Sequence, residues 1–145
     1  MQLNVTTGYA IRVIVYLLIK EGEIIKSSEL ADELSIPKNY ILKVTKKLEN
    51  ANLVKSYPGI KGGVQITRKA SEISLWDIVN ATEKTTKIHK CLEGEKHCLE
   101  SRVVECPIRK IYDELQDAVQ ERLSGITMDR LLVKEEKDST DEKEE

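Results

Sequence analysis

Three cysteines near the middle of the chain are the side chains best suited to chemistry. Cys91 is followed by Cys98 after six residues, and Cys98 by Cys106 after seven more. The residues between them are mostly charged or polar, which disfavours the alternative that the cysteines are simply small buried side chains. Because their number is odd, the cysteines cannot all pair within one chain. Metal binding or thiol chemistry is therefore the first question that the sequence raises.

The spacing of the cysteines bears on which metal they suit. Zinc fingers and ribbons usually pair their ligands at two- to four-residue spacing, and these cysteines lie further apart. Loosely spaced thiolates in one polar loop are more typical of an iron–sulfur cluster. A cysteine- or metal-dependent enzyme is the alternative from another class. It is disfavoured because no Cys-His-Asp set falls on predicted helices or strands and no glycine loop ends in Gly-Lys-Ser/Thr.

The elements before the cysteines have the pattern of a helix-turn-helix followed by a hairpin. Apolar residues repeat at helical spacing from Leu30 to Leu34 and again over residues 38–50, with a turn at Ile36-Pro37. Short apolar runs flank the glycine-rich stretch 59–63, which predicts two strands joined by a tight tip, the wing. We expect Ser28 to cap the first of these helices.

The predicted helix over residues 38–50 separates its residue types by face. Ile41, Val44 and Leu48 fall on one side, and Asn39, Lys43, Lys46 and Asn50 fall on the other. Residues 38–69 contain eight basic side chains and one acidic one, hence +7, whereas the whole chain has a net charge of −2, which leaves −9 elsewhere. This reversal of sign indicates a phosphate-binding surface, against the alternative of a solvated helix face beside an ordinary hairpin.

Further helices are expected on either side of these elements. A first helix ends near Glu21, with Thr6 or Thr7 as its cap, and Ser74 caps a short helix after the wing. Pro107 opens a long helix that reaches about Ser124. This last helix carries an apolar stripe formed by Ile108, Ile111, Leu115 and Val119. Because so small a domain offers nothing to cover that stripe, the stripe predicts a homodimer.

The fold class that follows is mainly α with a small β-wing, a winged helix-turn-helix domain plus a long dimerisation helix. We expect four parts: the winged domain over residues 1–82, the cysteine-rich cluster-binding loop over 83–106, the dimerisation helix with a short C-terminal helix over 107–133, and a disordered acidic tail over 134–145. The longest apolar run is far below membrane-spanning length and no secretory signal precedes it, so a cytoplasmic location without membrane contact is expected.

The order of several motifs carries a family resemblance. They are Leu3-x-x-x-x-Gly8-Tyr9-Ala10, the wing pair Gly62-Gly63, the run Leu75-Trp76-Asp77-Ile78-Val79, the three-cysteine loop and the long helix. Over about residues 1–133 the chain resembles the Rrf2 family of winged-helix transcriptional regulators, and within it most the IscR-like regulators that carry an iron–sulfur cluster.

The resemblance implies a homodimer that binds double-stranded operator DNA and senses cluster, iron or redox status. It places the second helix of the helix-turn-helix in the major groove and the wing at the minor groove. It makes Cys91, Cys98 and Cys106 the ligands of a cluster, with 2Fe-2S favoured and 4Fe-4S possible. Members that sense nitric oxide or thiol oxidation are the alternative. The residues that we assign to DNA binding are Ser28, Lys38, Asn39, Tyr40, Lys43, Lys46, Lys61, Gly62 and Gly63; none is assigned to catalysis.

Departures from the family pattern leave the fourth cluster ligand open. IscR-like members have a histidine where this chain has Arg109, and NsrR-like members use an acidic residue where it has Gly8. The nearest imidazoles are those of His89 and His97. In the wing, Pro58 stands in place of an arginine of IscR-like members, so Lys61 is expected to take over the contact with DNA.

Overall fold

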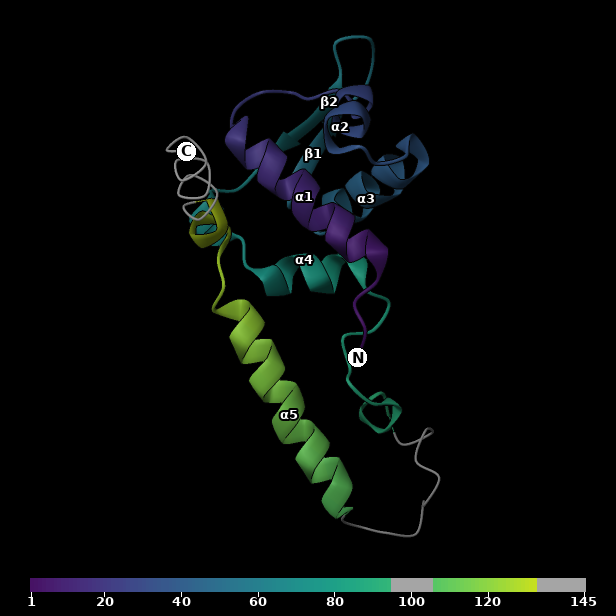
Figure 1. The fold of residues 1–145 in the computed structure, drawn as a ribbon, viewed down its shortest axis with the longest axis vertical. Coiled ribbons are helices and arrows are strands. Elements are labelled where there is room, and N and C mark those ends of the chain that lie inside the picture. The colour runs from purple at the N-terminus through teal and green to yellow at the C-terminus, as the bar shows by residue number, and fades with distance from the viewer. Residues whose placement is uncertain (95–105, 133–145) are drawn as a thin grey trace, which may run out of the picture.

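The computed structural model describes residues 1–94 and 106–132 of the 145 in the chain. Their order is α1 (Val5–Ile19), α2 (Ser27–Leu34), α3 (Lys38–Asn50), β1 (Val54–Tyr57), β2 (Gly63–Ile66), η1 (Ala70–Glu72), α4 (Leu75–Thr82), η2 (Lys90–Leu92) and α5 (Pro107–Ser124), and residues 128–132 are also helical. Figure 1 shows α1 lying across the winged domain, with α5 extending away from it. The expected winged helix-turn-helix fold is confirmed.

The core of the winged domain is built from the apolar faces of α1, α2, α3 and α4. Ile14, Leu30, Ile41 and Ile78, one from each helix, are completely buried. The turn between α2 and α3 passes through Ser35 in the left-handed conformation, with φ 51°. This turn directs Ile36 into the core, where it is buried, so apolar packing fixes the angle at which α3 leaves α2.

The wing is a two-stranded antiparallel sheet whose position is fixed by a third piece of chain. β1 pairs with β2 in a register that runs from Val54 opposite Ile66 to Tyr57 opposite Gly63. Ile25, just before α2, exchanges two backbone hydrogen bonds of 2.9 and 2.8 Å with Val64. Because Ile25 and Val64 are both buried, the base of the wing is rigidly joined to the start of the helix-turn-helix.

The chain after α5 returns to the winged domain and anchors the base of that helix. Leu75 N–H donates to Ile126 O at 2.9 Å, and Met128 N–H donates to Ile73 O at 2.9 Å. The Met128 side chain is completely buried in the same core as α1. Within the described ranges, no helix combines the length and hydrophobicity needed to span a lipid bilayer.

Two predicted caps are wrong. Asn4 caps α1 by accepting the Thr6 N–H at 3.0 Å; Thr6 and Thr7 are buried inside the helix. The Thr7 hydroxyl instead bonds Thr82 Oγ1 at 2.8 Å and donates to the Glu83 carboxylate, so tertiary contacts outweigh capping. Ser28 lies within α2, whose N-cap is Lys26 without a side-chain bond.

Two of the predicted helices have the bounds that the sequence pattern indicated, and the first helix is shorter. The predicted helices over residues 38–50 and 107–124 match α3 and α5. The first helix ends at Ile19 rather than near Glu21, because Lys20 already closes its last turn onto Tyr16 O. The expected disordered tail, residues 134–145, lies outside the described residues.

Candidate nucleic-acid interface

Helix α3 presents one polar face to solvent. Ile41, Val44 and Leu48 are completely buried. The predicted DNA-binding residues Lys38, Asn39, Lys43 and Lys46 are all exposed. Leu42 is exposed among them, so the face is less purely polar than the sequence pattern indicated. A helix held by its apolar side and open on its cationic side has the form needed to enter a DNA groove.

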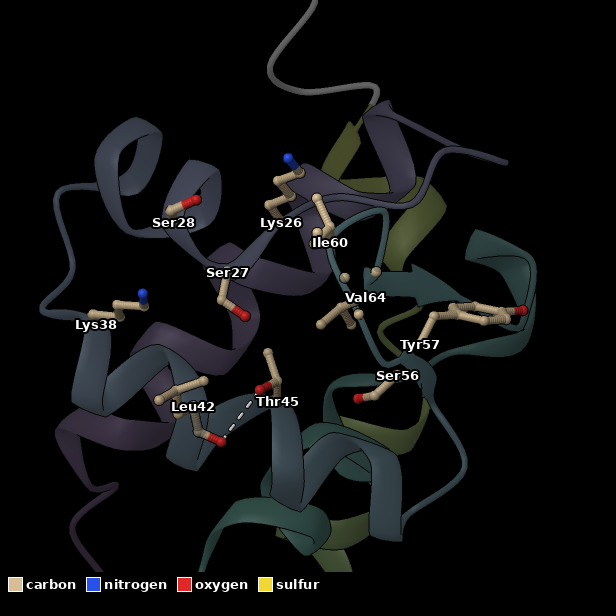
Figure 2. Close-up of a pocket in the computed structure, with 13 residues that line it drawn as sticks. Lys26, Ser27, Ser28, Lys38, Leu42, Thr45, Ser56, Tyr57, Ile60 and Val64 are labelled. Carbon is tan, nitrogen blue, oxygen red and sulfur yellow. Dashed lines mark hydrogen bonds between the residues drawn. The ribbon is translucent and has the colours of Figure 1, made fainter.

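A groove of about 550 Å³ runs between α3, the start of α2 and the wing. It is lined by Lys26, Ser27, Ser28, Lys38, Leu42, Thr45, Ser56, Tyr57, Gly59, Ile60, Gly62, Gly63 and Val64. In Figure 2 the side chains of Ser27, Thr45 and Ser56 surround the groove, and those of Lys26 and Lys38 lie at its rim. The Thr45 hydroxyl already donates to Ile41 O at 2.9 Å. The hydroxyls of Ser27 and Ser56 and the ammonium groups of Lys26 and Lys38 are the kinds of donors that bind phosphate oxygens.

The two predicted wing glycines are explained by close backbone contacts. A Cβ at Gly62 would overlap Tyr57 O and the Pro58 carbonyl, and a Cβ at Gly63 would overlap the Ile25 carbonyl. Beyond them the tip is free, since Lys61 is exposed and Ile60 is 92% exposed. Gly62 therefore fits the tight turn of the hairpin and Gly63 lets the wing lie against Ile25, while the tip remains available to a ligand.

Acidic side chains near this surface are already bonded to other groups. Glu49 accepts the Ser56 N–H at 3.2 Å and lies 3.7 Å from Lys46 Nζ, which is the only salt bridge within residues 1–94 and 106–132. Glu29 accepts the Tyr16 hydroxyl at 2.9 Å and thereby raises the pKa of Tyr16 to about 12. The other lysines around α3 therefore have no acidic partner in the described chain, which leaves the surface strongly cationic.

Tyr40 differs from the other predicted DNA-binding residues in its surroundings. It is half-buried, and its ring packs edge-on against Tyr9 at a centroid distance of 5.4 Å and an interplanar angle of 76°. Sequence reasoning missed Lys26, Ser27, Leu42, Thr45, Ser56 and Tyr57 of the groove. Lys38, Leu42 and Thr45 follow helical spacing, so their shared edge of α3 was readable, but the residues facing that edge depend on how the wing folds back.

The cysteine region shows two free thiols at the borders of the part that the structure does not describe. Cys91 lies on η2 and Cys106 precedes α5, and both are half-buried. The Cys106 thiol makes no capping bond, so both thiols are free for other chemistry. Cys98 and His97 lie outside the described residues. Among residues that are described, no group of three or more His, Cys, Asp or Glu is placed to hold a metal ion.

His89 and Gln116 join the segment before Cys91 to α5. His89 Nδ1 accepts the Cys91 N–H at 3.3 Å, and its ring stacks on Tyr112 of α5 at 4.5 Å and 16°. The Gln116 side chain, only 3% exposed, donates to Thr86 O at 3.0 Å and accepts the Ile88 N–H at 2.8 Å. Both polar ends of Gln116 are therefore satisfied by the backbone of one extended segment.

Comparison with known proteins agrees with this geometry. Residues 3–134 match the family Rrf2, described as iron-dependent transcriptional regulator. The chain is 26% identical over 138 residues to the transcriptional regulator NsrR of Bacillus licheniformis, covering 94% of this chain and 95% of that one. It is similar to the solved oxidized form of Staphylococcus aureus CymR, with 28% identity, a TM-score of 0.67 and coverage of 91% and 96%. The fold also resembles that of T. potens IscR, with a TM-score of 0.71, 18% identity and coverage of 92% and 88%.

Proposed function

Because this chain belongs to the Rrf2 family of DNA-binding transcriptional regulators, we propose that it is the iron–sulfur type of regulator, binding operator DNA as a homodimer and responding to the state of its cysteine loop. The observation that carries the DNA-binding part is the exposed cationic face of α3 beside the hydroxyl-lined groove under the wing. The family description points to regulation rather than to an enzyme. A regulator must reach the chromosome, which supports the expected cytoplasmic location.

In the proposed complex, α3 lies in the major groove. Asn39 reads a base edge through its amide, since a bidentate amide pairs well with adenine. Lys38, Lys43 and Lys46 contact phosphate or base edges, and Ser28 donates to phosphate from the start of α2. At the wing, Lys61 contacts a phosphate or the minor groove. Gly62 and Gly63 allow the backbone of the wing to come close to the DNA. Tyr40 acts by holding the start of α3 against Tyr9.

The proposed dimer rests on the uncovered stripe of α5. Ile108, Ile111 and Leu115 are 59%, 56% and 50% exposed. They are spaced so that they share one side of the helix, and a contiguous apolar stripe of this kind marks an interaction surface. A second copy of α5 covers such a stripe isologously, which also gives the two-fold symmetry that paired DNA half-sites require.

The proposed cofactor is held by Cys91, Cys98 and Cys106, with 2Fe-2S favoured over 4Fe-4S. The two described thiols are free and half-buried, which suits thiolate ligation of iron, and the family description names iron dependence. When bound, an iron–sulfur cluster supplies redox-responsive and ligand-reactive iron. His89 is the described imidazole next to these cysteines. Since its Nδ1 already accepts the Cys91 N–H, Nε2 is the nitrogen that it offers as a fourth ligand.

The second candidate is a regulator of the same fold that senses nitric oxide or thiol oxidation. It is favoured by the similarity to NsrR and to a CymR solved in an oxidized form, and by the free thiols of Cys91 and Cys106. Both candidates share the DNA-binding surface and differ in the chemistry of the loop.

An anaerobic visible spectrum, with iron and sulfide analysis of the same sample, tests the proposed cofactor. We expect a coloured protein with iron and sulfide in cluster stoichiometry, and loss of colour in Cys98→Ala. A colourless protein without iron or sulfide, after anaerobic reconstitution as well, contradicts the cluster and leaves the thiol-sensing candidate. DNA selected from a random pool then supplies an operator for the binding experiments.

A further inference from the structure

A second basic cleft lies along the other edge of α3, away from the wing. It has a volume of about 240 Å³ and is lined by Met1, Gln2, Leu3, Asn4, Lys43, Lys47, Thr82, Glu83, Lys84, Thr85 and Lys87. Figure 1 shows the N-terminus beside the segment that follows α4, and residues of both line the cleft. Four lysines line this one small cleft, and Glu83 is the only acidic residue of its lining.

The inner wall of the cleft is built by hydrogen bonds that engage its one acid, Glu83, and one of its four lysines, Lys47. Lys47 Nζ donates to Thr82 O at 2.7 Å and thereby joins α3 to the end of α4. Glu83, the acid of the lining, accepts the Asn4 N–H at 2.7 Å and the Thr7 hydroxyl. Lys43, Lys84 and Lys87 are exposed. The carboxylate is therefore committed to the start of α1, and three ammonium groups remain for an anion.

The cleft and the groove under the wing occupy opposite edges of the same helix. Lys43 and Lys47 are four residues apart and share one edge of α3, whereas Lys38, Leu42 and Thr45 share the edge toward the wing. A helix in the major groove has one phosphate backbone on each side. The wing-side groove serves one of these backbones, so the cleft is placed to serve the other.

We propose that this cleft binds backbone phosphates of the DNA strand on the side of α3 away from the wing, through Lys43, Lys84 and Lys87. The proposal rests on the proposed DNA-binding function and extends its contact surface to residues that follow the winged domain. Lys43, Lys84 and Lys87 of this open cleft are exposed, so an extended polyanion fits it better than a single enclosed ion.

The test compares the double variant Lys84→Ala/Lys87→Ala with Lys110→Ala, an exposed lysine on α5, as the matched control. Each lost phosphate contact makes the slope of log affinity against log salt shallower by about 0.9. For the double variant we expect a slope shallower by about 1.8, so that its affinity falls about twelvefold less than that of the unchanged protein between 50 and 200 mM salt. Lys110→Ala should leave the slope unchanged. Ethylation of the corresponding phosphates should interfere with binding of the unchanged protein but not of the double variant.

Two results separate this inference from the proposed function. If Lys46→Ala weakens binding but the double variant binds as the unchanged protein does, the cleft does not contact DNA and the inference is overturned alone. If neither variant affects binding, the DNA-binding surface itself is misplaced. Binding of inorganic phosphate is measured as well. If phosphate binds saturably and this binding needs Lys84 and Lys87, while the salt slope of DNA binding is the same for the double variant as for the unchanged protein, the cleft binds a free anion. That result also overturns the inference. Circular dichroism confirms that the variants are folded.

Discussion

Replacement of Lys46 by Ala gives a quantitative test of how α3 meets DNA. The Lys46 side chain is 71% exposed, and its Nζ lies 3.7 Å from the Glu49 carboxylate, in the only salt bridge among the described residues. Exposed pairs of this kind contribute about 0–1 kcal/mol, so the lysine can leave Glu49 for a phosphate at little cost. Its removal should therefore affect DNA binding much more than folding.

The magnitude follows from counterion release. One phosphate contact contributes about 0.9 to the slope of log affinity against log salt, so it accounts for an affinity loss of about 3.5-fold when salt rises from 50 to 200 mM. Lys46→Ala should bind more weakly at 50 mM, and the difference from the unchanged protein should narrow about 3.5-fold at 200 mM. Glu49→Gln, which keeps an acceptor for Ser56 N–H, should bind more tightly because it removes a negative charge beside the phosphates.

Fluorescence anisotropy at four salt concentrations measures the salt slopes of Lys46→Ala and of the unchanged protein. Each is measured on a selected operator and on an unrelated duplex. A phosphate contact should appear on both duplexes, whereas a base contact should appear on the operator alone. Parallel salt plots for Lys46→Ala and the unchanged protein, with equal thermal midpoints, would refute the assignment of Lys46 to phosphate.

Three further predictions follow from the described contacts. The double variant Ile111→Glu/Leu115→Glu should be monomeric, because two charges would be buried in the α5 interface. Light scattering measures this, and a wild type that is already monomeric at micromolar concentration contradicts the proposed dimer. Asn39→Ala should relax base preference at one operator position by about 1–3 kcal/mol, which selection from randomised DNA would reveal; an unchanged preference at every position excludes base readout by Asn39. Gln116→Leu should destabilise the fold by about 1–3 kcal/mol, because the Ile88 N–H and Thr86 carbonyl lose their partner; urea unfolding measures this loss, and an unchanged free energy of unfolding would contradict this role.

The helices could be predicted from local sequence patterns. The contacts between segments far apart in the sequence could not. Ser74 was correctly predicted to cap α4 because its partner Asp77 lies three residues away, where it also accepts the Ser74 N–H at 2.8 Å. Thr7 was a reasonable cap by residue type, but its hydroxyl bonds Thr82, which is 75 residues distant and invisible to a local pattern. Tertiary hydrogen bonds outweigh capping preference at such a position.

The same limit explains what was missed at the candidate site. The lysine-bearing face of α3 follows from helical spacing alone, and its residues are exposed as expected. The groove under the wing depends on the Ile25–Val64 pairing, and the second cleft depends on the bond from Lys47 to Thr82 O. Gln116 is a polar residue of an amphipathic helix, so the sequence pattern predicts that its side chain is exposed to solvent. It is nevertheless buried, because a separate segment supplies two backbone partners.

These contacts suggest how the cysteine loop and DNA binding are physically coupled. The segment that carries Lys84 and Lys87 is bonded to Gln116 of α5 through Thr86 and Ile88, and it leads directly to Cys91. A ligand of the cysteines shifts DNA affinity only if it binds better to one arrangement of this segment than to another. In the proposed complex, the two arrangements would differ in how Lys84 and Lys87 face the phosphates. A coupling of typical allosteric size, about 1–3 kcal/mol, would change the DNA affinity roughly five- to 150-fold. The anchorage at Gln116 is what makes such a transfer possible, because a freely moving segment would decouple the thiols from the lysines.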